Sequence, residues 1–432
     1  MLKFLSLLKV SVFIFCSVGI GGVSSLHAQA GCTSGADYVA LATAKRASQE
    51  LTEAVHALNC VLTSNPQDYS MVSQRMEVAL LDGQYGLAVR DANTLRDFSR
   101  QQFDQQLADY NMELTMSPND ETLLTFRSFI HWSNANDNGA LNDLEHLLSV
   151  NPNSSYGFLF RGSSLQYMGD ILQPADDFAD AIRLDPNNTD VYSIIGSTYT
   201  QTGNYALAVS FLQQAIAVDP NNARAHYFMG MAQNGQFNTD AAFQSFSQSL
   251  SIDSTFVDAY YDRGLLFAQR GDFQSALNDF NQIVSVNPAF RQVYSARGAV
   301  YEHLGDMPQA VLDFENYIEL STIERIQGEP LIAGIPQNLP MTDGRTYIFE
   351  INVMAGQTLQ VTASSQRNTT DPLVLLLDAN QTPLTGSDDA VLGDYSAQID
   401  GFTIPADGTY TLILTHSTGG FRAPIDLSLS FQ

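Results

Sequence analysis

The chain has 432 residues, of which 44 % are apolar, and its formal net charge is −26. This length is enough for two or three domains, and the apolar share is enough for a sizeable buried core. Because no basic patch offsets the acidic surface, nucleic acid and anionic lipid headgroups are excluded as expected partners.

The first 30 residues have the pattern of a signal peptide. Lys3 and Lys9 precede an apolar run over residues 10–23, and residues 28–30 form the small-x-small motif that signal peptidases accept. We therefore expect cleavage after this motif and a bacterial protein that is secreted or extracytoplasmic, without membrane attachment afterwards. Two alternatives stay open: the run is an uncleaved anchor, although it is short for a membrane span, or Cys32 is acylated.

A period of 34 residues runs through the middle of the chain, marked by prolines at one fixed position. With that proline at position 32, the units are 35–68, 69–102, 121–154, 155–188, 189–222, 223–256, 257–290 and 291–324. Positions 8 and 20 hold small residues, position 24 is mostly large and apolar, and position 15 is often glycine. This pattern is typical of two closely packed helices joined by a tight turn.

The segment AYYDRGLLFAQRGDFQSALNDFNQIVSVNP, residues 259–288, resembles the consensus of the tetratricopeptide repeat family. The resemblance implies an antiparallel helix pair in each unit and an all-α superhelical solenoid over residues 31–324, whose first helices line a concave groove. Residues 103–120 form an insert between the second and third units. Because apolar residues recur in it every three or four positions, we expect an additional helix that bends the stack.

Position 7 is arginine and position 23 is aspartate in the same five units, whereas the other three units have neither. The expected pairs are Arg75–Asp91, Arg127–Asp143, Arg161–Asp177, Arg263–Asp279 and Arg297–Asp313. Charge at both positions or at neither indicates an ion pair between the two helices of a unit, rather than catalytic acids.

Two cysteines remain after signal cleavage, and two cysteines in an exported chain suggest a disulfide. Cys32 precedes the first helix of the first unit, and Cys60 lies near the end of its second helix. Since antiparallel helices bring those ends together, we expect a Cys32–Cys60 disulfide that staples the N-terminal repeat. Two free thiols are the alternative.

In the repeat family, positions 2, 5, 9, 12 and 13 line the groove. The candidate binding residues at these positions are Phe129, Trp132, Tyr156, Tyr167, Gln201, Arg224, Tyr227, Asn234, Tyr261, Gln269 and His303. Aromatic and amide groups with little charge suit an extended polypeptide or a sugar chain. The alternative is that these rings pack against one another. The absence of lysine from the groove disfavours partners held by their C-terminal carboxylate.

After residue 324 the pattern changes to period two. Residues 325–344 are interpreted as a linker with a first strand at 330–334, and residues 345–432 as a jelly-roll-like all-β sandwich. The expected strands are 345–353, 357–364, 372–378, 398–404, 408–416 and 424–431.

The motifs at 347–349, 355–357, 371–378, 387–389 and 408–412 resemble the bacterial pre-peptidase C-terminal domain. Some domains of that family bind calcium or insoluble polymers, as the resemblance implies. Asp371, Asp388, Asp389 and Asp394 are weak calcium candidates here, although solvated surface aspartates are the more common case.

The chain has no HExxH or GxSxG motif and no glycine-rich phosphate loop, and its histidines are not at metal-ligand spacing. We therefore expect no catalytic site, no cofactor and no metal. The favoured interpretation is an exported, non-catalytic scaffold that binds a protein or peptide in the repeat groove. The alternative is a cell-surface module whose sandwich binds carbohydrate or fibrous protein, with the repeats as a spacer.

Overall fold

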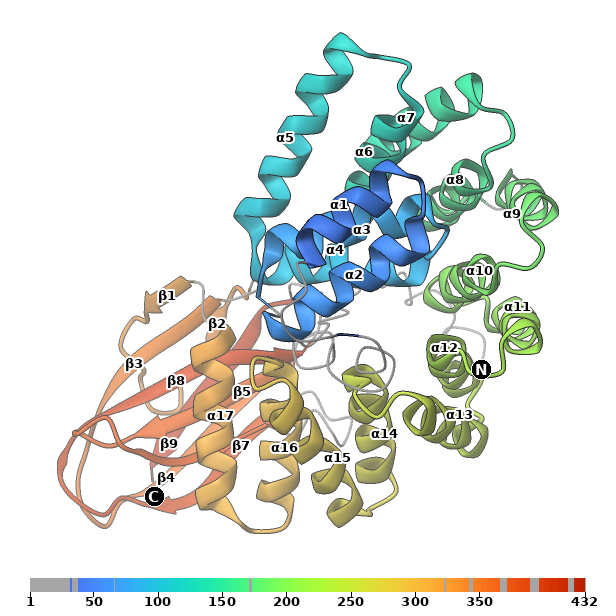
Figure 1. The fold of residues 1–432 in the computed structure, drawn as a ribbon. Coiled ribbons are helices and arrows are strands. Elements are labelled where there is room, and N and C mark those ends of the chain that lie inside the picture. The colour runs from blue at the N-terminus through green and yellow to red at the C-terminus, as the bar shows by residue number, and fades with distance from the viewer. Residues whose placement is uncertain are drawn as a thin grey trace. The chain divides into compact units, whose positions relative to one another are not determined.

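The computed structural model describes residues 32, 38–65, 67–170, 173–321, 324–341, 345–365, 371–388, 396–418 and 423–431. The expected signal peptide, Asp389 and Asp394 lie outside the described residues. The described chain is a helical solenoid followed by a β-sheet region (Figure 1), so the predicted fold class is confirmed. None of the described helices is long and apolar enough to span a membrane.

The chain divides near residue 259 into two compact parts, which we call the N-terminal part and the C-terminal part. The word unit is kept for one 34-residue repeat. The helices of the N-terminal part are α1 (Tyr38–Ala47), α2 (Leu51–Ser64), α3 (Tyr69–Leu81), α4 (Tyr85–Phe98), α5 (Arg100–Met116), α6 (Glu121–Ser133), α7 (Asp137–Val150), α8 (Ser155–Met168), α9 (Gln173–Leu184), α10 (Thr189–Gln201), α11 (Tyr205–Val218), α12 (Ala223–Gly235) and α13 (Thr239–Ile252). The C-terminal part contains most of α14 (Val257–Gln269), then α15 (Phe273–Val286), α16 (Arg291–His303), α17 (Met307–Ser321) and all the described strands. All described helices except α5 therefore form consecutive pairs, each of which is one repeat. The pairs are α1/α2, α3/α4, α6/α7, α8/α9, α10/α11, α12/α13, α14/α15 and α16/α17.

Position 15 of every unit lies in the turn between its two helices, with left-handed backbone. These residues are Gln49, Gly83, Ala135, Gly169, Gly203, Phe237, Gly271 and Gly305, with φ between 54° and 86°. Glycine adopts this conformation without strain, whereas a residue with a Cβ is penalised. The turn therefore explains the recurring glycine and identifies three strained positions, of which Phe237 is also 93 % exposed.

Glycine at position 8 has a different role, because it makes room for the large residue at position 24. A Cβ on Gly230 would lie 2.6 Å from the ring of Phe246, and one on Gly298 would lie 2.5 Å from that of Phe314. Both rings are at most 1 % exposed. Burial of each such ring stabilises the fold by roughly 2–3 kcal/mol.

The insert forms α5, so the prediction of an additional helix is confirmed, although the helix begins three residues before the insert does. Its apolar side buries Phe103, Tyr110 and Leu114. The hydroxyl of Tyr110 donates to Glu77 of α3 at 2.5 Å. The helix is therefore packed against its neighbours along its length.

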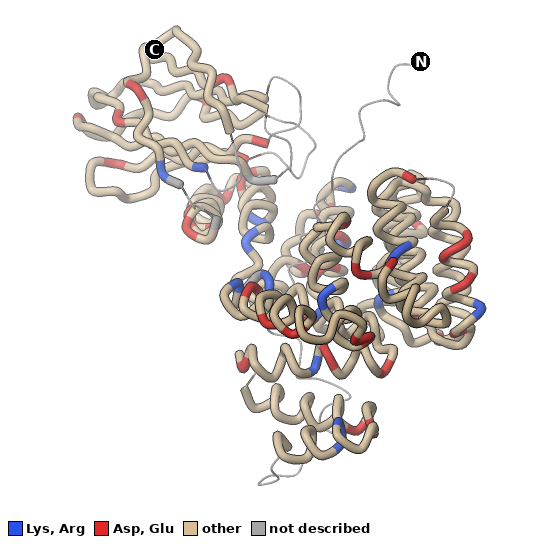
Figure 2. Tube along the Cα trace, turned by 90° about the horizontal axis from the view of Figure 1, so that it is seen from above, with Lys and Arg blue, Asp and Glu red and all other residues tan. Residues whose placement is uncertain are grey.

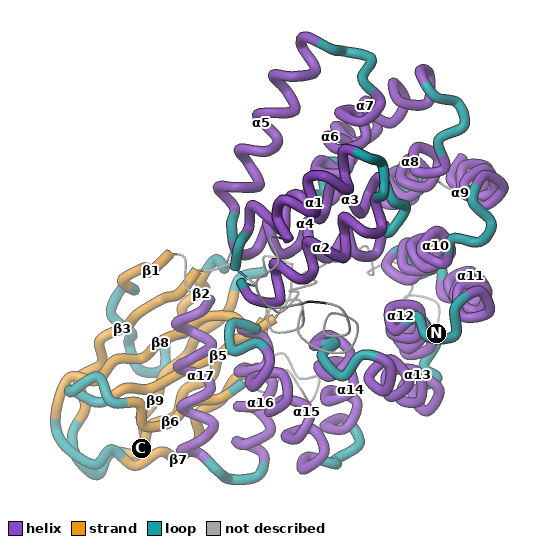
Figure 3. Tube along the Cα trace, viewed as in Figure 1, coloured by secondary structure: helices purple, strands orange, loops and turns teal. Residues whose placement is uncertain are grey.

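The strands are β1 (Glu324–Gln327), β2 (Gln337–Leu339), β3 (Arg345–Val353), β4 (Thr358–Ser365), β5 (Asp371–Leu377), β6 (Pro383–Ser387), β7 (Ser396–Thr403), β8 (Gly408–Thr418) and β9 (Ile425–Phe431). The strands are drawn in orange in Figure 3. They form two sheets, in the orders β1-β3-β8-β5-β6 and β2-β9-β4-β7. Both sheets contribute side chains to one buried core, with Phe349, Leu412 and Leu376 from one and Leu359, Val361 and Leu427 from the other. Without β1, this strand order is that of a jelly roll.

Two details of the sequence interpretation are wrong here. Residues 330–334 contain a turn at Gly334 instead of a strand, and β1 and β2 lie on either side of it. Strand β6 was not expected, because Pro383 and Gly386 weaken its strand signal. It pairs with β5 at the edge of its sheet, where proline is tolerated.

Candidate functional site

Each of the five predicted Arg–Asp pairs is in contact in the structure, with shortest N–O distances of 2.5–2.8 Å. In each pair the arginine Nε and Nη2 donate to the two carboxylate oxygens, as Arg75 does to Asp91. Burial raises the pKa of Asp279 and Asp313, and the paired guanidinium opposes this effect. Since both oxygens of each acid are engaged, these aspartates join the helices of a unit.

The candidate residues Phe129 and Tyr156 lie inside an aromatic cluster. The Phe160 ring centroid is 5.5 Å from that of Phe129, 4.8 Å from Trp132 and 4.6 Å from Tyr156. Tyr85 of α4 adds a fifth ring, 5.9 Å from Tyr156 and 5.8 Å from Phe160. Phe129 is 0 % exposed and Tyr156 is 6 % exposed, so here the alternative interpretation applies, in which the rings pack together.

The turn before α4 is hydrogen-bonded to the start of α10, about a hundred residues further along the chain. Asn188 Nδ2 donates to the carbonyl oxygen of Gly83 at 3.0 Å, and the Gly86 N–H donates to Asp190 Oδ2 at 2.8 Å. Burial raises the pKa of Asp190, and the Gly86 N–H opposes this effect. Helix α4 thus covers inner-face residues that the repeat pattern alone places in an open groove.

Sequence reasoning missed Tyr85 and Gly86, because both lie on the second helix of a unit. Second helices normally face away from the groove in the repeat family that the sequence resembles. The only signal of their position was the insert that follows α4.

Trp132 is half-buried within this aromatic cluster. Four other candidates in the N-terminal part of the chain also keep accessible surface. Tyr167 and Gln201 are half-buried and hydrogen-bonded to each other, and Asn234 is exposed. Half-buried Arg224 lies over the Phe228 ring at 5.0 Å, and its buried Nε has no hydrogen-bond partner among the described residues. Tyr227, in contrast, is buried among Phe228, Phe246 and Phe256.

In the C-terminal part, Gln269 and His303 are exposed and Tyr261 is half-buried. The Tyr261 ring lies 6.1 Å from Phe280 and 5.3 Å from Phe290, and burial raises the pKa of its hydroxyl. These three residues keep accessible surface, although Tyr261 belongs partly to the core.

The sandwich covers part of the inner face of α16. The Ser295 hydroxyl donates to Asp388 Oδ2 at 2.7 Å, and the Asp388 N–H donates to Glu302 Oε2 at 3.0 Å. Ser295 and Glu302 occupy groove positions 5 and 12 of the last repeat. On the next helix, Tyr317 donates to the carbonyl oxygen of His416 at 2.7 Å. The sandwich therefore caps the last repeat.

Of the weak calcium candidates, Asp371 and Asp388 are described, and they are 1 % and 0 % exposed. Neither belongs to a described group of three or more clustered metal-ligand side chains. Acidic residues are instead spread over both helices and strands (Figure 2).

An apolar cavity of about 490 Å³ opens between α9, α10 and α11. Its lining includes Phe178, Tyr199, Leu207 and Phe211, and Leu207 is 48 % exposed. Phe211 stands at position 23 of a unit without the Arg–Asp pair, so the sequence signal for this cavity is the missing aspartate.

Comparisons with known proteins identify the helical repeats. Residues 196–236 match a family model described as TPR repeat, and residues 261–322 match one described as tetratricopeptide repeat. These segments are therefore tetratricopeptide repeats. Neither match reaches the sandwich, so its resemblance to the pre-peptidase C-terminal domain stays a prediction. A search of curated proteins gives no match.

Several solved structures are similar to the chain. The crystal structure of MamA is 26 % identical over 37 % of this chain and 93 % of that one, with a TM-score of 0.34. The APC/C hetero-tetramer Cut9–Hcn1 is 14 % identical over 66 % and 53 %, with a TM-score of 0.45. The human IFIT1 dimer with m7Gppp-AAAA is 14 % identical over 66 % and 76 %, with a TM-score of 0.44. At these TM-scores the likenesses carry no inference about ligands.

Proposed function

We propose that this tetratricopeptide-repeat protein is an exported, non-catalytic scaffold that binds an extended polypeptide on the inner face of its repeats. One observation carries the proposal. Tyr167, Gln201 and Asn234 stand at positions 13, 13 and 12 of three consecutive units and all keep accessible surface. Side-chain amides both donate and accept hydrogen bonds, as a peptide backbone does, so a row of such groups can bind an extended chain.

Arg224 extends this surface at the N-terminal end of α12. Its guanidinium can donate to a backbone carbonyl or to an acidic side chain of the ligand. We define the inner-face site as Tyr167, Gln201, Arg224 and Asn234. It excludes Phe129, Tyr156 and Tyr227, because their rings are buried.

The export part of the proposal is supported by the signal pattern of residues 1–30 and by the Cys32–Cys60 disulfide. N-terminal sequencing of protein recovered from outside the bacterial cytoplasm tests it. A mature chain beginning at Gly31 is expected, and a chain that retains Met1 would contradict cleavage.

A peptide-display library screened against the full mature chain tests the binding function. We expect selected peptides to bind the wild type and to lose at least tenfold in affinity for a Gln201→Ala/Asn234→Ala variant, measured by fluorescence anisotropy. The matched control is Gln213→Ala/Gln248→Ala, which changes two exposed glutamines on the second helices α11 and α13. Equal losses in both variants would contradict the inner-face site.

The alternative is that the sandwich attaches the protein to an extracellular polymer. Its support is the resemblance to the pre-peptidase C-terminal domain. Cosedimentation of the full mature chain with insoluble polysaccharide or fibrous protein, together with failure of the peptide selection, would favour this alternative.

A further inference from the structure

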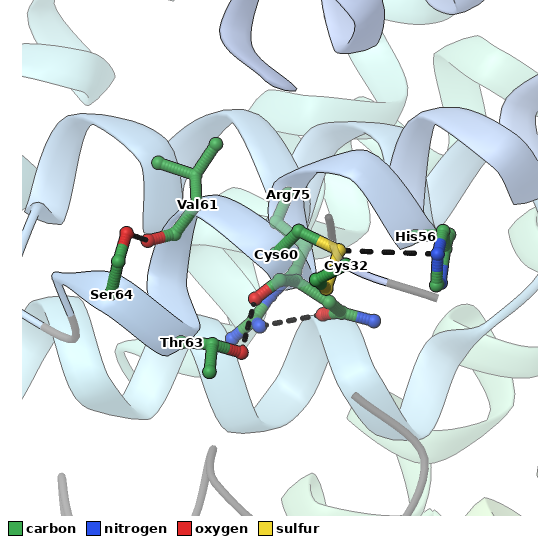
Figure 4. Close-up of a disulfide and its surroundings, with 8 residues drawn as sticks. Cys32, His56, Cys60, Val61, Thr63, Ser64 and Arg75 are labelled. Atoms are coloured by element: carbon green, nitrogen blue, oxygen red, sulfur yellow. Dashed lines mark hydrogen bonds between the residues drawn. A yellow bond between two sulfur atoms is a disulfide. The ribbon is translucent and has the colours of Figure 1, made fainter. Parts of the chain in front are cut away.

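Two cysteines and a histidine, residue types that can ligate a metal ion, meet at the N-terminal repeat (Figure 4). Cys32 and Cys60 form a disulfide, and His56 lies one helical turn before Cys60 on α2. The distance from His56 Nε2 to Cys60 Sγ is 3.9 Å. The two sulfur atoms and an imidazole nitrogen all lie within 4.8 Å of one another, and in the part of the chain that the structure describes this is the only such group of three.

We propose that Cys32, His56 and Cys60 bind a thiophilic divalent cation of the Zn²⁺ class when the disulfide is reduced. Zinc accepts thiolate sulfur at ~2.3 Å and imidazole nitrogen at ~2.0 Å, which places tetrahedral donor atoms roughly 3.5–3.8 Å apart. The present nitrogen–sulfur distance is close to that value. Water would fill the fourth coordination position, as it does in zinc sites with three protein ligands.

The required rearrangement is local. Helix α2 fixes His56 and Cys60 on one face, because residues four apart in a helix are neighbours. Cys32 lies outside any helix or strand. Once the disulfide opens, the Cys32 sulfur needs to move away from the Cys60 sulfur by less than about 2 Å to reach the spacing of two ligands in a tetrahedral zinc site.

The chemistry balances with an external thiol or phosphine as the reductant. Two thiols become a disulfide, or a phosphine and water become a phosphine oxide, and the two electrons released break the sulfur–sulfur bond. Each cysteine sulfur takes up one of the two protons released. Metal binding then displaces both protons, so that two thiolates and a neutral imidazole coordinate the ion. The N-terminal repeat would be stapled in both redox states, by a covalent bond when oxidised and by the metal when reduced.

Cobalt(II) is the probe for this site, because its thiolate complexes absorb visible and near-ultraviolet light. The full mature chain is titrated with Co²⁺ after reduction by a phosphine and, in parallel, in its oxidised form. We expect one ion per reduced chain with thiolate charge-transfer bands, and no such bands for the oxidised chain. Zn²⁺ should displace the cobalt and raise the Tm of the reduced chain alone.

Two variants decide the role of histidine. His56→Ala should weaken Co²⁺ binding at least tenfold, whereas His226→Ala, which changes a histidine on α12, should leave it unchanged. Circular dichroism of both oxidised variants checks that they fold, which is expected because His56 is exposed. The proposal is overturned if the reduced wild type binds no more cobalt than the oxidised form, or if both variants bind like the wild type.

Discussion

Arg127 of α6 donates a hydrogen bond from Nη1 to Asn111 of α5 at 3.0 Å, sixteen residues upstream. Its other nitrogens bind Asp143, sixteen residues downstream. The same geometry occurs in ordinary repeats, where Arg75 donates to Asn59 and Arg297 donates to Asn281 at the same spacing. In those repeats the asparagine lies on the second helix of the preceding unit. Helix α5 therefore takes the place of such a second helix.

The insert is thus half a repeat, a second helix without its own first helix. Because α5 follows the second helix α4 directly, two second-type helices are consecutive, and the alternation of the solenoid is broken there. The break accompanies the contact of α4 with α10 through Gly86 and Asp190, which no regular stack would make. Half a repeat consequently determines which part of the inner face stays accessible.

The buried ion pairs predict strongly asymmetric mutational effects. Asp91→Ala should destabilise the protein by about 3–5 kcal/mol, because it leaves the guanidinium of Arg75, 3 % exposed, without its counter-charge. Arg75→Met/Asp91→Leu should cost much less, since both charges are removed. The urea midpoint measures these effects. Asp180→Ala is the control, because it breaks an exposed pair with Arg183 and should cost under about 1 kcal/mol. Equal losses for Asp91→Ala and Asp180→Ala would contradict this account.

The turn at position 15 predicts stabilising substitutions. Ala135→Gly should raise the free energy of unfolding by about 1 kcal/mol, because Ala135 has a φ of 54°. Phe237→Gly should act in the same direction. Gly203→Ala is the opposite control and should lose about 1 kcal/mol by backbone strain alone, since its Cβ would meet nothing within 4 Å. Thermal unfolding measures all three, and a destabilised Ala135→Gly would refute the strain argument.

The aromatic cluster predicts a coupled change in stability and fluorescence. Tyr85→Ala should cost about 3 kcal/mol, because Tyr85 is 5 % exposed and in contact with two other rings. Trp132, the only tryptophan, packs on Phe160 of the same cluster, so its emission should move to longer wavelength. Tyr69→Ala, a half-buried position on α3 outside the cluster, should leave the emission unchanged. An unchanged spectrum in Tyr85→Ala would show that α4 does not cover these rings.

Asp137 predicts a pH dependence of stability. Burial raises its pKa from the ordinary 3.8 to about 6, and the Ser164 hydroxyl opposes this effect. The folded state therefore binds the proton more tightly than the unfolded state, so this contribution to stability is present below pH 4 and is lost as pH rises through 6. The loss is at most about 3 kcal/mol.

Asp137→Asn should therefore be more stable than the wild type at pH 7, and this advantage should disappear near pH 4. The difference in Tm between variant and wild type, measured from pH 4 to pH 7.5, tests the sign. A constant difference across that range would contradict the assignment.

Local features of the fold were predictable because each depends on residues at fixed spacing. The helix pairs, the position-15 turns, the Arg–Asp contacts and the Cys32–Cys60 bridge all follow from the 34-residue period. The jelly-roll strands followed from period-two runs, apart from β6 and the misplaced strand at 330–334. These features require only that neighbouring segments of the chain pack against each other.

The accessible part of the inner face was not predictable from the period. Whether Tyr156 meets solvent depends on Tyr85, which comes from a unit before the insert. Similarly, Ser295 has the sequence position of a groove residue, but it binds Asp388 of the sandwich. Both outcomes depend on contacts between segments about seventy to a hundred residues apart, for which a repeat pattern carries no information.

Hydrogen–deuterium exchange of the full mature chain, with and without a selected peptide, tests the inner-face site most directly. The account predicts slower exchange in the last turns of α8 and α10 and along α12, which carry Tyr167, Gln201, Arg224 and Asn234. Slower exchange confined to the second helices, or to strands of the sandwich, would contradict it.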